Sequence, residues 1–127
     1  MDSFIGWVGG KKLLRDTIIS NFPETFGRYV EVFGGAGWVL FRKPQEKGQL
    51  EVYNDFDSNL VNLYRCVKYH PEALEKELSY IVQSSELFYD FKEQLYMRGL
   101  TDIQRAARYF YLIKMSFGCK NDSFATR

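Results

Sequence analysis

Three closely spaced glycines between two β-rich runs limit most strongly what this chain can fold into. Residues 29–33 read YVEVF, the glycines follow within the next four positions, and a second β-rich run over 50–53 leads to Asp55. Glycine has no Cβ atom, so the backbone can turn sharply there and a ligand can approach it closely. An acid about 20 residues beyond such a turn can accept hydrogen bonds from a ribose. The stretch predicts a nucleotide-type binding site, and the alternative is a plain tight turn with Asp55 as a helix cap.

The composition is that of one soluble globular domain. The 127 residues are 46% hydrophobic and 26% charged, and no run of about 18 apolar residues predicts a membrane span. Residues 1–10 lack the basic start and the long apolar core of a secretory signal, so we expect a cytoplasmic protein without membrane contact. The net charge is only +1, so any contact with nucleic acid has to come from local basic patches.

The cysteines and the histidine do not predict a metal site or a disulfide framework. Cys66 and Cys119 are far apart in the sequence, neither belongs to a CxxC pair, and His70 is the only histidine. Structural zinc sites group four ligands of these types at short spacings. We therefore expect no bound metal.

The opening segment places two glycines and a lysine at the start of a predicted helix. Apolar residues recur every fourth position over about 11–22, which predicts the helix, and Gly9 and Gly10 stand just before it. A helix N-terminus with Lys11 beside it holds an anionic group such as a carboxylate well. Trp7 offers a flat ring next to it. The alternative is that Trp7 belongs to the core and the lysine is solvated.

The glycine turn lies inside a predicted βαβ unit. A strand over about 28–33, a short helix over 37–42 and a strand over 50–53 follow one another. A longer helix comes next, with Asp57 or Ser58 as its N-cap. Parallel strands joined through a helix are typical of the start of a doubly wound α/β sheet.

From Pro71 onward the pattern predicts only helices. Pro71 suits the first position of a helix, and Thr101 or Asp102 is the expected N-cap of the last one. The three predicted helices cover about 71–84, 85–97 and 102–117, and a polar loop follows them.

Three motifs taken together resemble a known family. FIGWVGGKKLL, VEVFGGAG and VYNDFDSNLVNLY are similar, in this order, to the aromatic-x-GGK, E-P-F-x-G-x-G and N-D-x-N-x-x-L-x-N-x-Y motifs in the amino-terminal half of Dam-type DNA adenine methyltransferases. The resemblance implies a Rossmann-like α/β fold that binds S-adenosyl-L-methionine, with a helical insertion that helps to read double-stranded DNA. It divides the chain into a cofactor-binding portion, residues 1–70, and a helical target-recognition portion, residues 71–127.

The resemblance assigns the cofactor to the opening segment, the glycine turn and the acid beyond it. The implied cofactor contacts are Trp7, Gly10, Lys11, Glu31, Phe33, Gly35, Ala36, Gly37, Asp55 and Phe56. Basic residues are the candidates for contact with DNA phosphates, with an ordinary solvated charge as the alternative for each. These candidates are Lys12, Arg105, Arg108, Lys114 and Lys120.

The chain departs from the family pattern in its loop and at the catalytic motif. Val32 replaces the usual loop proline, and Gly6 stands where many relatives have a basic residue. No D-P-P-Y or N-P-P-Y motif is present, because the prolines at 23, 44 and 71 are never adjacent. In the family that motif orients the adenine amine for methyl transfer, so no catalytic residue is assigned. NDSF at 121–124 lacks both prolines, whose fixed φ would aim the backbone carbonyl.

The sequence leaves the extent of the sheet and two rival functions open. Only two strands are predicted, whereas a doubly wound sheet needs about five or six. We therefore expect a fragment, a prophage-type remnant or one piece of a split enzyme. It should be inactive alone, and it should self-associate or pair with a missing carboxy-terminal half.

One rival function is that of a nicotinamide dinucleotide enzyme, which Leu40 disfavours because it replaces the third glycine of that fingerprint. The other is a non-catalytic helical binding or regulatory module.

Overall fold

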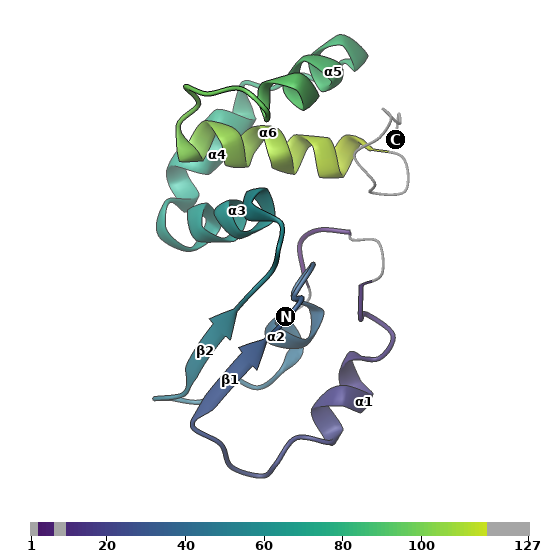
Figure 1. The fold of residues 1–127 in the computed structure, drawn as a ribbon, viewed down its shortest axis with the longest axis vertical. Helices are drawn as coiled ribbons and strands as arrows, with labels where there is room; N and C mark the ends of the chain where they lie inside the picture. The colour runs from purple at the N-terminus through teal and green to yellow at the C-terminus, as the bar shows by residue number, and fades with distance from the viewer. Residues whose placement is uncertain (1–2, 7–9, 117–127) are drawn as a thin grey trace. The chain divides into compact units, whose positions relative to one another are not determined.

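The chain forms two compact units in a computed structural model that describes residues 3–6 and 10–116 (Figure 1). The first unit runs to Phe56, and the second begins at Asp57. The first contains the strands and two short helices, and the second contains helices. This boundary separates two groups of residues that pack mainly among themselves. The division at residue 70 separates expected functions, and it stays a prediction.

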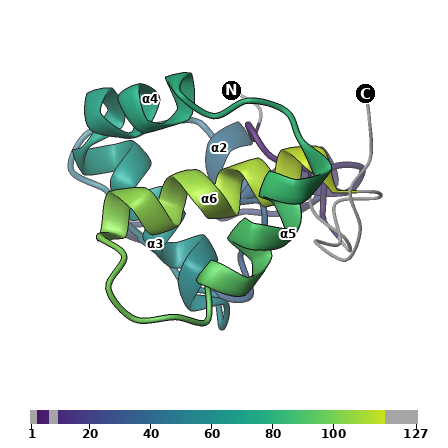
Figure 2. The ribbon, with the colours of Figure 1, turned by 90° about the horizontal axis from the view of Figure 1, so that it is seen from above.

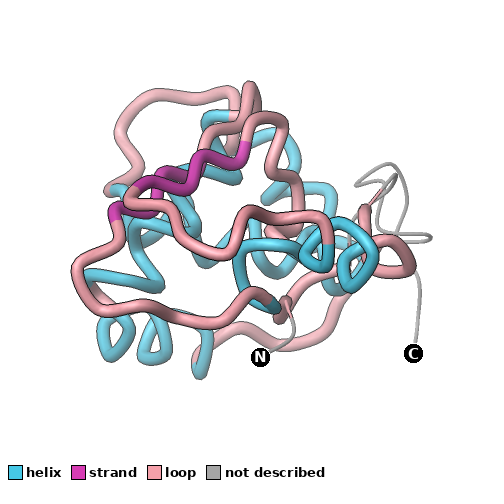
Figure 3. Tube along the Cα trace, turned by 90° about the horizontal axis from the view of Figure 1, so that it is seen from below, coloured by secondary structure: helices cyan, strands magenta, loops and turns pink. Residues whose placement is uncertain are grey.

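The first unit is the predicted βαβ unit with a short helix in front of it. Its elements are α1 (Arg15–Ser20), β1 (Arg28–Glu31), α2 (Trp38–Arg42) and β2 (Leu50–Tyr53). The strands lie side by side in Figure 3 and pair in parallel, with Val30 opposite Val52 and Glu31 opposite Tyr53. Because α2 joins two parallel strands, the expected connection is confirmed.

The two faces of this sheet differ in what covers them. On one face the Glu31 side chain is only 5% exposed, and it accepts a hydrogen bond from the Leu40 amide of α2. Neighbouring residues of a strand point to opposite faces. The partners Val30 and Val52 therefore share the other face, where they remain 47% and 37% exposed. Parallel sheets are normally covered on both faces, so this apolar face suits further packing.

Two predicted boundaries in the first unit are wrong. The helix expected to start near Lys11 begins at Arg15, because residues 11–14 form only a turn in which the Leu14 amide donates to the Lys11 carbonyl at 3.1 Å. No side chain caps this helix, and Leu14 is 60% exposed, so little stabilises an additional turn. The strand expected to reach Phe33 ends at Glu31, because Phe33 has a left-handed φ of 56°.

The second unit is a group of four helices around α6. They are α3 (Ser58–Tyr69), α4 (Pro71–Ser79), α5 (Ser85–Gln94) and α6 (Asp102–Met115). Each of the other three packs against α6, which Figure 2 shows running across the centre of the unit. Leu60, Leu63, Phe88 and Leu112 are completely buried, so these apolar residues form part of the core of this unit.

Polar residues at the helix starts confirm two of the expected caps. The Asp57 carboxylate accepts from the amides of Asn59 at 2.9 Å and Leu60 at 3.2 Å. Thr101 and Gln104 form a reciprocal capping box at the start of α6, with both hydrogen bonds at 3.1 Å. Pro71 occupies the start of α4, as predicted.

Two helices of the second unit are shorter than predicted. α4 ends at Ser79 and not near residue 84, and Val82, which lies between these two positions, is 70% exposed. α5 ends at Gln94 and not at Met97. Beyond α5 the chain turns, and the Leu95 and Met97 carbonyls accept hydrogen bonds from Arg105. A side chain of α6 thus holds this turn, and local spacing gives no sign of such a contact.

Within the part of the chain that the structure describes, no helix is long and apolar enough to cross a bilayer. In the same residues, no group of three or more His, Cys, Asp or Glu side chains could hold a metal ion. Cys66 is a buried free cysteine, and burial raises the pKa of its thiol. Cys119 lies outside the described residues.

Candidate functional site

The glycine turn after β1 uses left-handed backbone at three of its five residues. Phe33, Gly35 and Gly37 have φ values of 56°, 51° and 65°. Glycine adopts this conformation without steric cost, which explains two of these positions, whereas Phe33 is a strained exception. Strained backbone of this kind is concentrated at ligand sites.

Glycine is needed at position 34 for a different reason, because the Tyr53 ring leaves no space for a side chain. A Cβ atom built on Gly34 would lie 2.3 Å from Cε2 and 2.8 Å from Cδ2 of the Tyr53 ring. The ring is itself held, because its hydroxyl donates to the Gly35 carbonyl at 2.6 Å. The turn is therefore packed tightly against the end of β2, and only glycine fits at this position.

Asp55 lies directly on the glycine turn. Its Oδ2 accepts a hydrogen bond from the Gly35 amide at 2.8 Å. This bond brings together the two features that the sequence pairs across 20 residues. A carboxylate can accept about four hydrogen bonds, so the bond to Gly35 is compatible with further donors from a ligand. That Asp55 holds a ribose stays a prediction.

Glu31 is a buried carboxylate beneath the turn with one oxygen satisfied and one not. Oε2 accepts from the Leu40 amide at 2.8 Å and from the Tyr29 hydroxyl at 3.0 Å. Oε1 is buried and has no hydrogen-bond partner. Burial raises the pKa of this carboxyl above its ordinary value, while the two hydrogen bonds and the charge of Lys11 oppose the rise. Burial also raises the pKa of Tyr29, together with the charges of Glu31 and Glu51.

Lys11 reaches the same turn from the opening segment. Its ammonium donates to the Phe33 carbonyl at 3.2 Å. The sequence placed this charge at a helix N-terminus, but Lys11 begins a turn and the helix starts only at Arg15, so the lysine acts here through its side chain alone. Trp7, the other residue expected from this segment, lies outside the described residues.

The remaining predicted cofactor contacts differ in their exposure to solvent. Two phenyl rings are open to solvent, with Phe33 75% and Phe56 98% exposed. Ala36 is 1% exposed, so neither its side chain nor its backbone is open to solvent. Exposed aromatic rings beside a glycine turn are suited to stacking on a flat heterocycle.

A comparison with protein families agrees with this geometry. Residues 7–122 match the family described as D12 class N6 adenine-specific DNA methyltransferase. The chain belongs to this family. The assignment confirms the resemblance that the three motifs indicate, and the parallel β1–α2–β2 unit is compatible with the cofactor fold that the family implies.

Individual methyltransferases are similar over nearly the whole chain. It is 32% identical over 119 residues to the type II methyltransferase M1.LlaDCHI of Lactococcus lactis subsp. cremoris, covering 90% of this chain and 41% of that protein. It is 25% identical over 126 residues to the DNA adenine methylase of Haemophilus influenzae, covering 94% and 43%. It is 27% identical over 120 residues to the Escherichia coli K12 enzyme of the same name, covering 91% and 41%. The chain thus spans about two fifths of the length of these relatives.

Methyltransferases of this family generally use S-adenosyl-L-methionine, and the glycine turn has groups that fit it. The cofactor offers an adenosine and an amino acid with one carboxylate and one ammonium. Asp55 supplies an acceptor on the turn, and Lys11 supplies a cation 3.2 Å from the Phe33 carbonyl. The unpartnered Oε1 of Glu31 is an acceptor that lacks a donor. The residues therefore fit the cofactor in charge and in hydrogen-bonding capacity.

The arginines predicted to contact DNA already have structural partners in the second unit. Arg105 donates to the Leu95 carbonyl at 2.6 Å and to the Met97 carbonyl at 3.1 Å. Arg108 donates to the Gln94 side chain at 2.6 Å, and its guanidinium lies 5.0 Å from the ring centre of Phe91. Both guanidinium groups stabilise the end of α5, and a phosphate would have to compete with these bonds.

The predicted DNA-binding lysines rest beside aromatic rings. Lys12 lies 5.3 Å from the ring centre of Trp38, and Lys114 lies 5.5 Å from that of Phe110. Lys120 lies outside the described residues. That these lysines contact DNA stays a prediction.

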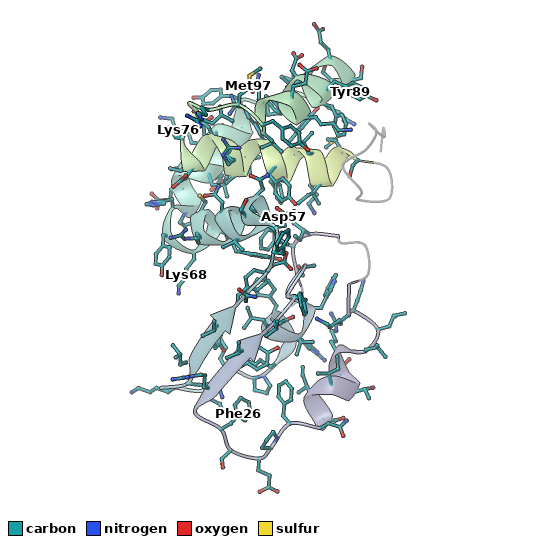
Figure 4. All side chains as sticks on the ribbon, in the orientation of Figure 1. Phe26, Asp57, Lys68, Lys76, Tyr89 and Met97 are labelled. Carbon is teal, nitrogen blue, oxygen red and sulfur yellow. The ribbon has the colours of Figure 1, made fainter. Side chains whose placement is uncertain are left out.

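Basic residues other than the predicted DNA contacts are exposed as well. Lys68 and Lys76, labelled in Figure 4, are exposed on α3 and α4. Arg65 lines a cavity of about 360 Å³ at the junction of α3 and α6, together with His70 and Asp102. The sequence pattern did not point to these residues, and their exposure is known only from the fold.

Proposed function

We propose that this chain is the cofactor-binding, amino-terminal portion of an S-adenosyl-L-methionine-dependent DNA adenine-N6 methyltransferase. The observation that carries this proposal is the Asp55 carboxylate bound to the Gly35 amide, on a turn built from left-handed backbone. The family match over residues 7–122 supports it. When bound, the cofactor supplies a methyl group on a sulfonium, ready for attack by an amine.

The residues of the chain hold the cofactor in this proposal. Asp55 accepts hydrogen bonds from the ribose hydroxyls, and the exposed rings of Phe33 and Phe56 cover faces of the adenine. Trp7, Gly10 and Lys11 contact the amino-acid end, where the ammonium of Lys11 attracts a carboxylate. The backbone of residues 35–37 approaches the cofactor closely because it lacks bulky side chains.

A binding titration tests the cofactor assignment. We expect S-adenosylhomocysteine to bind in isothermal calorimetry and NAD to give no response. Asp55→Asn keeps an acceptor for Gly35 but removes the charge, and a charge-assisted hydrogen bond contributes about 1.5–3 kcal/mol, so affinity should fall at least about tenfold. Asp90→Asn, an exposed change on α5 that also removes one negative charge, is the matched control. Equal affinity of the two variants would contradict the assignment.

We propose further that the second unit contacts double-stranded DNA in the whole enzyme and that this chain alone does not transfer the methyl group. Its relatives include DNA adenine methylases, which supports a DNA substrate. The absence of adjacent prolines leaves no D-P-P-Y or N-P-P-Y motif to orient the target amine.

The apolar sheet face supports pairing with a further polypeptide. Leu50, Val30 and Val52 are 52%, 47% and 37% exposed on one side of two parallel strands. We propose that a carboxy-terminal portion of the same family covers this face, since the relatives are more than twice as long as the matched region. Co-expression with residues beyond the matched part of the Lactococcus relative should give a co-purifying pair. Val52→Asp should abolish this co-purification. If this chain alone forms a homodimer in sedimentation experiments, the apolar face instead mediates self-association.

A further inference from the structure

Tyr53 and Asp55 hold the two backbone polar groups of one residue of the glycine turn. The Asp55 carboxylate accepts a hydrogen bond from the Gly35 amide at 2.8 Å, and the Tyr53 hydroxyl donates to the Gly35 carbonyl at 2.6 Å. Tyr53 is the last residue of β2, and Asp55 follows it by two positions. Gly35 is therefore restrained at both its amide and its carbonyl by side chains from the end of one strand.

The conformation of Gly35 depends on these restraints, because glycine has no side chain of its own. Gly35 has a φ of 51°, and glycine adopts positive and negative φ about equally readily. Backbone hydrogen bonds hold its neighbours: the Gly34 amide donates to the Asn54 carbonyl at 2.9 Å, and the Gly37 amide donates to the Gly34 carbonyl at 2.8 Å. At Gly35 both hydrogen bonds come from side chains instead, so a substitution can remove either of them without changing the backbone bonds of the turn.

The Tyr53 side chain is placed firmly enough to act as such a restraint. Its backbone belongs to β2, where it lies opposite Glu31 of β1. Its ring lies so close to Gly34 that a Cβ atom built there would be 2.3 Å from Cε2. The 2.6 Å separation between its hydroxyl and the Gly35 carbonyl is within the range of a good O–H···O hydrogen bond. The hydroxyl therefore holds this carbonyl from a strand and a packed ring.

We propose that Tyr53 is a positioning residue for cofactor binding, because its hydroxyl keeps Gly35 in the conformation in which the Gly35 amide reaches Asp55. This proposal rests on the proposed function, in which Asp55 contacts the cofactor, and it adds a residue that acts through Gly35 and Asp55. Tyr53 is not among the cofactor contacts that the sequence predicts. An acceptor that is oriented before the ligand arrives loses less conformational freedom on binding, so the restraint favours affinity.

Removing only the Tyr53 hydroxyl tests this proposal. Tyr53→Phe keeps the ring against Gly34 and removes the hydrogen bond to the Gly35 carbonyl. An ordinary hydrogen bond corresponds to a factor of about five in an equilibrium constant, so the affinity for S-adenosylhomocysteine in calorimetry should fall about fivefold. Tyr111→Phe is the matched control, because it removes a buried tyrosine hydroxyl that hydrogen-bonds Ser84 in the second unit. It should leave this affinity unchanged.

Hydrogen exchange of single amides, followed by NMR, shows whether the hydroxyl acts through Gly35. In the free wild type we expect the Gly35 amide to be protected, because the turn is held before the cofactor arrives. In Tyr53→Phe the Gly35 amide should exchange about fivefold faster. The Asn54 amide, which donates to the Glu31 carbonyl at 2.9 Å, is the internal reference and should keep its rate.

The outcomes separate the role of Tyr53 from the cofactor assignment. Wild-type affinity in Tyr53→Phe, or a loss of affinity with unchanged exchange at Gly35, would overturn the role of Tyr53 and leave the cofactor assignment standing. Equally faster exchange at Gly35 and Asn54 would overturn it too, because the variant would then destabilise the whole unit. Fast exchange of the Gly35 amide in the free wild type would contradict the proposal without any variant. If S-adenosylhomocysteine does not bind the wild type, both proposals are wrong.

Discussion

Replacing Gly34 with alanine tests how closely the glycine turn is packed against β2. The added Cβ would lie 2.3 Å from Cε2, 2.8 Å from Cδ2 and 3.1 Å from Cζ of Tyr53, so the ring has to move. Moving it breaks the 2.6 Å hydrogen bond from its hydroxyl to the Gly35 carbonyl. Overpacking costs about 1–3 kcal/mol and the lost bond about 0.5–1.5 kcal/mol. We expect Gly34→Ala to destabilise the first unit by about 2–4 kcal/mol.

Urea unfolding followed by tryptophan fluorescence measures this loss for the relevant unit. The chain has two tryptophans, Trp7 and Trp38, and both belong to the first unit. Gly27→Ala is the matched control, because nothing lies within 4 Å of a Cβ built there. We expect that change to be close to neutral.

A double variant shows whether the Tyr53 ring causes the loss. In a Tyr53→Ala background the ring atoms are absent, so adding Gly34→Ala should cost less than about 1 kcal/mol. A Gly34→Ala chain as stable as the wild type would refute the packing argument. A double variant in which Gly34→Ala keeps its full cost would show that the strain comes from the backbone and not from the ring.

The remaining predictions concern the second unit and the activity of the chain. Arg105→Ala should lower the stability of the second unit by about 1–3 kcal/mol, measured by helix content during urea unfolding, because it removes two bonds from a charged donor to carbonyls beyond α5. The salt slope of DNA binding should stay unchanged in that variant, and a slope reduced by about 0.9 would instead indicate a phosphate contact. The chain alone should transfer no label from S-adenosylmethionine to adenine in mixed-sequence DNA. Label that disappears in an Asp122→Ala, Phe124→Ala variant would make 121–124 a catalytic motif.

Local patterns predicted the parts of the fold that depend on neighbouring residues. β2 has the predicted bounds, and Asp57 and Thr101 cap helices, because caps and strand periodicity act over a few residues. The start of α1 was predicted too early, since nothing in the spacing showed that Leu14 would be 60% exposed. Helix ends depend on whether the surrounding fold buries an extra turn, and a single sequence does not contain that information.

The site shows the same division between local and distant contacts. The glycines and Asp55 could be selected from the sequence, and the structure brings them within hydrogen-bonding distance. The conflict between a Cβ at position 34 and the Tyr53 ring could not be foreseen, because it joins two elements through space. The unsatisfied oxygen of Glu31 is also visible only when every neighbour of the side chain has a position.

The Asp57 side chain makes the order of synthesis matter for the second unit. One of its oxygens caps α3, and the other accepts a hydrogen bond of 2.5 Å from the hydroxyl of Tyr109, which lies 52 residues later on α6. On the ribosome, α3 emerges before Tyr109, so at that stage the Asp57 carboxylate lacks the hydrogen bond from α6. We therefore expect the start of α3 to become more stable when α6 arrives. A nascent chain arrested before residue 109 should show a frayed α3 that becomes protected once the arrest point is moved past α6.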